Sequence, residues 1–155
     1  MESAVQNDKS KPNVLFLCTG NSCRSQMAEG WAGHLHGNSL AAYSAGVKPT
    51  VLNADAVRVM SEAGVDISRQ RSKHVDEMAH IPFDYVVTVC DEAHEACPVF
   101  PGRAKVIRHT FDDPPRLAKD AASEVERLAP YRRVRDEIRE FVQSLPAMLA
   151  NKEEP

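Results

Sequence analysis

The sequence predicts an α/β protein built around a doubly wound parallel sheet. Three short runs of apolar and β-branched residues, at 13–18, 84–90 and 104–109, are typical of buried parallel strands, and a weaker fourth run covers 40–44. Helix-like segments lie between these runs. Strands that alternate with helices along a chain form a parallel sheet with helices on its faces.

The helical segments differ in how clearly they are marked. One helix is expected over 25–36, and a second over 53–63 opens on the N-cap residue Asn53. The pattern over 73–80 is weaker. No repeat, linker or low-complexity segment interrupts this order.

The longest helix is expected from Ser123 to about Leu145. Pro130 lies inside it and predicts a kink or a restart near its beginning. Apolar residues recur there at steps of three or four, which predicts one face packed against the sheet. These residues are Val125, Leu128, Tyr131, Val134, Ile138, Phe141 and Leu145.

Composition favours one compact domain. The 155 residues are 43% hydrophobic, which predicts a single domain over 13–150 after a flexible N-terminal extension over 1–12. The net charge of -3 and the scattered Lys and Arg residues argue against nucleic acid as a partner. The polar start does not resemble a secretory signal, and no apolar run approaches the roughly 20 residues that span a bilayer. We expect a cytoplasmic monomer without membrane contact, in which cysteines stay reduced.

The most informative segment is the loop that follows the first strand, residues 18–25, reading CTGNSCRS. Cys18 leaves the strand, and the loop closes at the start of the first helix. Amides of the loop and of the first helical turn, together with the helix dipole, favour a tetrahedral oxyanion above Cys18. Oxyanion binding is therefore assigned to Thr19, Gly20, Asn21, Ser22, Cys23, Arg24 and Ser25.

Each side chain of this loop has an expected role. The amides, the helix N-terminus and Arg24 should lower the pKa of Cys18 and make it a nucleophilic thiolate. The planar fork of Arg24 can hold two oxygens at once. Gly20 is expected to supply a positive φ angle, and Ser25 either caps the helix or donates to the thiolate. Cys23 is expected to be chemically inert.

Residues 14–31, reading VLFLCTGNSCRSQMAEGW, resemble the active-site segment of the low-molecular-weight tyrosine phosphatase superfamily, and specifically of its arsenate reductase branch. Further blocks resemble the family in the same order: YSAG at 43–46, VDIS at 65–68, VTVC at 87–90, FDDP at 111–114 and VRDEI at 134–138. The resemblance covers most of 13–145. It implies a three-layer fold whose four parallel strands are ordered 2-1-3-4.

Two further cysteines distinguish this chain from a simple phosphatase. In the implied strand order, Cys18 and Cys90 end neighbouring strands about 4.8 Å apart, so their thiols could bond. Cys97 follows seven residues later, and a helix between Cys90 and Cys97 would hold their Cα atoms about 10.5 Å apart, whereas disulfides rarely exceed about 7 Å. A bridge between those two requires the segment to unwind. The resemblance implies that Cys90 and Cys97 are the resolving cysteines.

The general acid is expected after the last strand. Asp113 directly precedes Pro114, which resembles the Asp-Pro of the superfamily's acid, whereas Asp112 is interpreted as a turn residue. Some family members hold potassium near the loop, and Lys73 stands where an acidic ligand is expected. We predict that the Lys73 ammonium replaces that cation. The cysteine spacings do not match common zinc sites, and no metal or other cofactor is expected.

The function implied by the resemblance is reduction of arsenate to arsenite through Cys18, Cys90 and Cys97, with thioredoxin as the reductant. Phosphate or sulfate can occupy the same loop. A phosphotyrosine phosphatase is the alternative, although it needs no resolving cysteines and Gln26 stands where phosphatases usually have proline. A redox sensor or anion-binding regulator without turnover is a third possibility, but a complete set of catalytic groups exceeds what binding requires.

Overall fold

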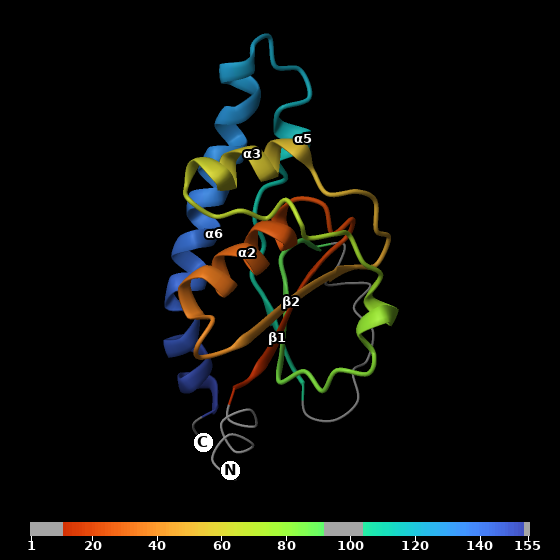
Figure 1. Cartoon of the computed structure of the whole chain (residues 1–155), viewed down its shortest axis with the longest axis vertical. Coiled ribbons are helices and arrows are strands. Elements are labelled where there is room, and N and C mark those ends of the chain that lie inside the picture. Colours follow the sequence, from red (N-terminus) through yellow and green to blue (C-terminus); the bar gives the residue numbers. More distant parts are fainter. Residues whose placement is uncertain (1–10, 92–103, 154–155) are drawn as a thin grey trace.

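The computed structural model describes residues 11–91 and 104–153 and shows a four-stranded sheet with helices packed beside it (Figure 1). Residues 1–10 of the expected extension and Cys97 lie outside the described residues. The elements in chain order are β1 Asn13–Cys18, α2 Arg24–His36, β2 Ala41–Gly46, α3 Ala54–Glu62, the 3-10 helix η1 Val75–Met78, β3 Tyr85–Thr88, β4 Lys105–Arg108, α5 Pro114–Leu117 and α6 Glu124–Glu153.

The sheet is parallel and its strands are ordered β2-β1-β3-β4, which confirms the predicted fold class and strand order. The central strands are buried: every residue from Val14 to Cys18 is buried, as are all four residues of β3. A strand covered on both faces carries apolar side chains at consecutive positions, which explains the unbroken apolar runs in the sequence. In β4, at the edge, only Ile107 is buried.

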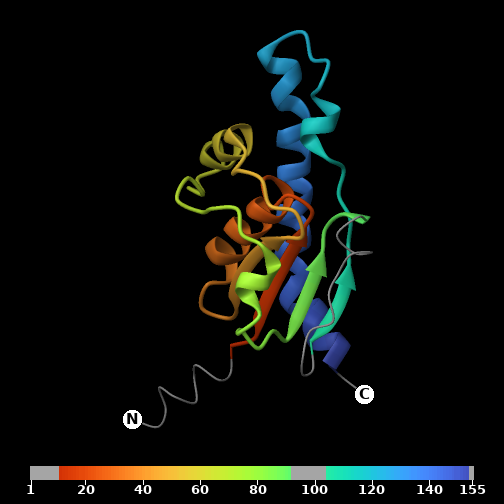
Figure 2. The ribbon, with the colours of Figure 1, turned by 90° about the vertical axis from the view of Figure 1, so that its right-hand side faces the viewer.

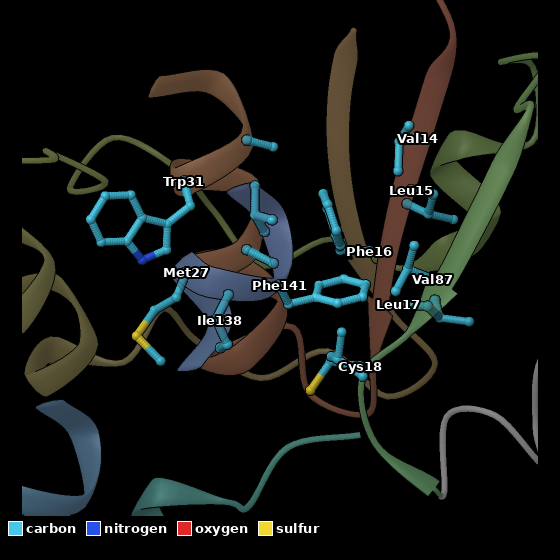
Figure 3. Close-up of a cluster of buried hydrophobic side chains, with 14 of the residues drawn as sticks. Val14, Leu15, Phe16, Leu17, Cys18, Met27, Trp31, Val87, Ile138 and Phe141 are labelled. Carbon is cyan, nitrogen blue, oxygen red and sulfur yellow. The ribbon is translucent and has the colours of Figure 1, made fainter. Parts of the chain in front are cut away.

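The helices α2 and α6 lie together on one side of the sheet, and η1 lies on the other (Figures 1 and 2). Phe16 of β1 points toward Ile138 and Phe141 of α6, while Leu15 and Leu17 point to the opposite side (Figure 3). The predicted apolar face of α6 is buried from Leu128 to Leu145. Its first member is an exception, because Val125 is 71% exposed.

Of the kink or restart predicted at Pro130, the restart does not occur, because α6 runs without a break from Glu124 to Glu153. A proline removes one main-chain hydrogen bond, and the neighbouring Leu128 and Tyr131 are buried against the core, which supports the helix at this point. Tertiary packing therefore outweighs the local propensity.

Two other segments differ from expectation. The predicted helix over 73–80 is only the short η1, which is capped by the His74 side chain at its start. The four-residue helix α5 was not predicted; its first two residues are Pro114 and Pro115, which suit a first helical turn because their missing N–H groups would have no partner there. None of the helices in the described part of the chain has the length and apolar character that a membrane crossing requires.

Candidate active site

The candidate site lies at the carboxyl end of β1, where the chain turns into α2. Cys18 is the last residue of the strand, and Arg24 is the first residue of the helix. Cys18 is 4% exposed, and the main-chain N–H of Ser25 donates to its sulfur. The thiol therefore lies at the N-terminus of α2, where a main-chain amide of the first helical turn donates to it, as the sequence predicts.

Asn21, rather than Gly20, has the left-handed conformation in this loop, with φ at 49°. The prediction for Gly20 is wrong, because asparagine tolerates this region and its side chain holds the turn. The Asn21 amide nitrogen donates to Ser25 Oγ at 2.8 Å, and its Oδ1 accepts from the Lys73 main-chain nitrogen at 2.8 Å. Asn21 is fully buried, so these bonds fix the shape of the loop.

Ser25 does not cap the helix. The N-cap residue is Cys23, which makes no side-chain cap hydrogen bond, and Ser25 is already the second residue of α2. Its buried hydroxyl instead accepts the hydrogen bond from Asn21. The helix begins one residue earlier than predicted, which turns Ser25 from a cap into part of the loop's internal support.

Arg24 is oriented by the segment that carries the candidate acid. Its Nη1 donates to the Phe111 carbonyl at 2.9 Å, and its Nη2 lies 3.7 Å from an Asp113 carboxylate oxygen. The buried Nε has no hydrogen-bond partner among the described residues. Because a buried N–H needs an acceptor, this atom fits an oxygen of a bound tetrahedral anion.

The thiols of Cys18 and Cys90 form a hydrogen bond, although they are 72 positions apart in the sequence. The Thr19 hydroxyl also contacts the Cys90 sulfur, at 3.2 Å. Cys90 is 5% exposed and follows β3, the strand next to β1. The predicted approach of these two thiols is therefore present in the folded chain.

The predicted lowering of the Cys18 pKa is wrong. The hydrogen bond with Cys90 and burial raise the pKa of Cys18 well above its usual value, while Arg24 and the Ser25 amide act in the opposite direction. A second buried thiol at hydrogen-bond distance competes with the anion-stabilising donors of the loop. Burial likewise raises the pKa of Cys23, which agrees with its interpretation as an inert residue.

A pocket of about 390 Å³ opens beside these groups. Asp113 lines it and has a side chain that is 40% exposed, so solvent and a ligand in the pocket can both reach it. Asp112 lines it as well, but its carboxylate is held at 3.0 Å by Arg133 of α6. Arg116 adds a further positive charge to the wall and has no ion pair with any described residue. The full lining is Thr19, Arg24, Cys90, Asp91, Thr110, Phe111, Asp112, Asp113 and Arg116.

Lys73 lies beside the loop as its sequence position predicts. Its Nζ donates to the Arg71 carbonyl at 2.8 Å and lies 3.8 Å from Glu29 Oε1, which also accepts from the Ser44 hydroxyl. Burial lowers the pKa of Lys73, and Glu29 opposes this effect. Within residues 11–91 and 104–153, no group of three or more His, Cys, Asp or Glu side chains forms a metal-binding cluster.

The structure brings Cys18, Arg24, Ser25, Cys90 and Asp113 to one end of the sheet. Sequence reasoning missed the contact between Arg24 and the Phe111 carbonyl, the contribution of Arg116 to the pocket and the role of Gln26 in supporting the loop. Hydrogen bonds to main-chain carbonyls cannot be predicted from residue types, because every residue has a main-chain carbonyl. The charge of Arg116, three positions after Asp113, was the only sequence feature that could have indicated its place.

Comparison with known proteins gives a consistent result. The family model for low molecular weight phosphotyrosine protein phosphatase matches residues 13–154. An arsenate reductase of Bacillus licheniformis is 47% identical over 133 residues, which cover 86% of this chain and 94% of that protein.

Solved structures agree with this result. A structure described as an arsenate reductase in the phosphate binding state is 31% identical, with a TM-score of 0.69 over 88% of this chain and 98% of that chain. A low molecular weight protein tyrosine phosphatase from T. tengcongensis has the same TM-score of 0.69 at 26% identity, over 89% of this chain and 99% of that chain. The fold is therefore common to reductases and phosphatases.

Proposed function

Because the chain belongs to the low molecular weight phosphotyrosine protein phosphatase family, we propose that it is an arsenate reductase of that family, in which Cys18, Cys90 and Cys97 act in sequence. The observation that carries this proposal is the hydrogen bond between the Cys18 and Cys90 thiols beside Arg24. A hydrolase needs one nucleophilic cysteine. A second thiol in contact with the first one suits a reaction that ends in a disulfide.

In the first step, arsenate binds in the loop, where Arg24 Nε and the loop amides donate to its oxygens. An oxygen of the arsenate dianion takes up the Cys18 thiol proton, Cys18 Sγ attacks arsenic, and an S–As bond forms as an As–O bond breaks. Asp113 gives a proton to the departing oxygen, which leaves as water. Its position 3.7 Å from Arg24 and its partial exposure support this role.

In the second step, Cys90 Sγ attacks Cys18 Sγ. The S–As bond breaks, its electron pair goes to arsenic, and arsenite leaves in the +3 state with the proton of the Cys90 thiol, while a Cys18–Cys90 disulfide forms. Cys97 then attacks Cys90, which releases Cys18 as a thiolate and leaves a Cys90–Cys97 disulfide. In a reducing cytoplasm, a dithiol protein of the thioredoxin type returns two electrons and restores both thiols.

A phosphotyrosine phosphatase is the second candidate, favoured by the loop itself, because phosphate and arsenate are both tetrahedral oxyanions and present the same charge to Arg24. The low molecular weight protein tyrosine phosphatase from T. tengcongensis also shares this fold. Pro115 follows Asp113-Pro114 where phosphatases have an aromatic residue, so this pocket lacks an expected support for an aryl group. Slow release of phosphate from a small aryl ester is compatible with the reductase, whereas fast release is not.

The proposal is tested by following NADPH consumption with arsenate, thioredoxin and thioredoxin reductase. The wild type should turn over, and both Cys90→Ser and Cys97→Ser should lose turnover. Gly33→Ala is the control that should keep wild-type turnover, because a Cβ at Gly33 meets nothing within 4 Å and the position lies outside the oxyanion loop. Equal turnover in all variants would remove the resolving roles, and no arsenate-dependent consumption with thioredoxin or glutaredoxin would refute the reductase function.

A further inference from the structure

Gln26 is fully buried in the first turn of α2, and its side-chain amide makes three hydrogen bonds. Its Nε2 donates to the main-chain carbonyls of Asn21 and Arg71, at 2.9 Å each. Its Oε1 accepts from Gln70 Nε2 at 2.7 Å. Three of the four hydrogen-bonding positions of this buried amide are therefore used: both donors go to main-chain carbonyls, one in the oxyanion loop and one at Arg71, and the oxygen accepts from the Gln70 side chain.

The loop atom that Gln26 holds belongs to the residue with the unusual backbone. Asn21 has φ at 49°, and its carbonyl accepts from Gln26 Nε2 and from the Ser72 hydroxyl, at 2.6 Å in the second case. A left-handed residue other than glycine persists only where the surroundings hold it. Gln26 is one of the groups that supply this support.

Gln70 fixes the supporting amide in turn. Its Nε2 donates both to Gln26 Oε1 and to the Gln26 main-chain carbonyl, at 3.1 Å. This pair of bonds sets which way the Gln26 amide faces, so that Nε2 rather than Oε1 meets the two carbonyls. The chain from Gln70 through Gln26 to Asn21 links the 70–72 segment to the loop.

We propose that Gln26 is a positioning residue that keeps the oxyanion loop in its anion-binding shape without contacting the anion. It acts through Asn21, whose position between Gly20 and Ser22 decides where the loop amides point. The inference rests on the proposed function only in taking arsenate as the natural ligand. The role itself concerns any tetrahedral anion that the loop binds.

The test measures the dissociation constant of inorganic phosphate for the reduced full-length protein by isothermal titration calorimetry. Gln26→Met keeps the side-chain length and removes all three hydrogen bonds. Phosphate affinity should fall about tenfold or more, the change expected when the hydrogen bonds that hold a site are lost. Trp31→Phe is the control. It removes one hydrogen bond of the same helix, from Trp31 Nε1 to the Arg135 carbonyl at 3.1 Å, and that bond is made to α6 rather than to the oxyanion loop.

A residue with only a structural role would give a different pattern. Both variants would then lower the melting temperature and leave the phosphate dissociation constant within twofold of the wild type, which would overturn the proposal. Gln70→Ala provides a milder test if Gln26→Met does not fold: it should weaken phosphate binding about threefold, and unchanged binding would also contradict the role. Because phosphate binding needs no turnover, an inactive reductase that still shows the Gln26 effect would refute the function and leave this inference intact.

Discussion

Gly46→Ala should damage the site through a steric conflict that the structure measures directly. Gly46 ends β2, pairs with Cys18 in the sheet register and donates its N–H to the Lys73 carbonyl. A Cβ atom added here would lie 2.6 Å from the Thr19 carbonyl oxygen and 2.9 Å from the Asn21 nitrogen. Both are main-chain atoms of the oxyanion loop, so a rotamer change cannot relieve the contact.

The size of the effect follows from those distances. Ordinary contact begins at 3.4 Å, so the loop and the end of β2 must separate by about 0.8 Å. Overpacking of this kind costs about 1–3 kcal/mol of stability. A misplacement of about 1 Å in a catalytic site can cost on the order of 10²-fold in rate, so kcat/KM for arsenate should fall about 10- to 100-fold.

The assay compares kcat/KM for arsenate and the phosphate dissociation constant with those of Gly33→Ala. A Cβ at Gly33 meets nothing within 4 Å, and alanine in a helix interior should stabilise α2 by about 0.5–1 kcal/mol. Gly33→Ala should therefore keep wild-type activity. A folded Gly46→Ala protein whose kcat/KM and phosphate affinity stay within twofold of the wild type would refute the steric reasoning.

Three further perturbations address the charges around the loop. Cys90→Ala removes the hydrogen bond that raises the pKa of Cys18, so Cys18 should ionise at lower pH, and its iodoacetamide alkylation profile should move to lower pH; an unchanged profile would contradict the assigned cause. Arg116→Gln should raise KM for arsenate about two- to fivefold at low salt and less at high salt, because Arg116 lines the pocket. The control is Lys119→Gln, which removes an exposed positive charge outside the pocket lining. An equal change in KM for both variants would show that Arg116 has no specific role in attracting arsenate. Because Lys73 Nζ lies by Glu29, potassium and sodium should support equal activity at constant ionic strength, and a severalfold rise with potassium would argue against replacement of the cation.

The central strands and the anion loop could be predicted because their signals are local. β1 is an unbroken apolar run that ends on Cys18, and the loop residues follow without a gap. The bounds of an edge strand were harder to predict. The second strand was expected at 40–44 and is Ala41–Gly46, because pairing with β1, rather than its own residue pattern, determines where this strand begins and ends.

The internal support of the loop could not be predicted from the sequence. Which residue takes the left-handed conformation depends on contacts from Ser72 and Lys73, about 50 positions away, and these favour Asn21 over Gly20. The pKa of Cys18 depends on a thiol that only the tertiary fold brings near it. Residue types indicated a thiol nucleophile in an oxyanion loop, whereas hydrogen bonds between distant segments determine the loop conformation and the pKa of Cys18.

The most direct test of the three-cysteine reaction is a single turnover of Cys97→Ser, in which the relay should stop after its second step. Reduced protein is mixed with arsenate in the absence of a reductant, arsenite is quantified, and the disulfide is located by peptide mass spectrometry. We predict about one arsenite per protein chain and a Cys18–Cys90 disulfide, as the two thiols in contact would form. No arsenite, or arsenite without a Cys18–Cys90 disulfide, would contradict the mechanism.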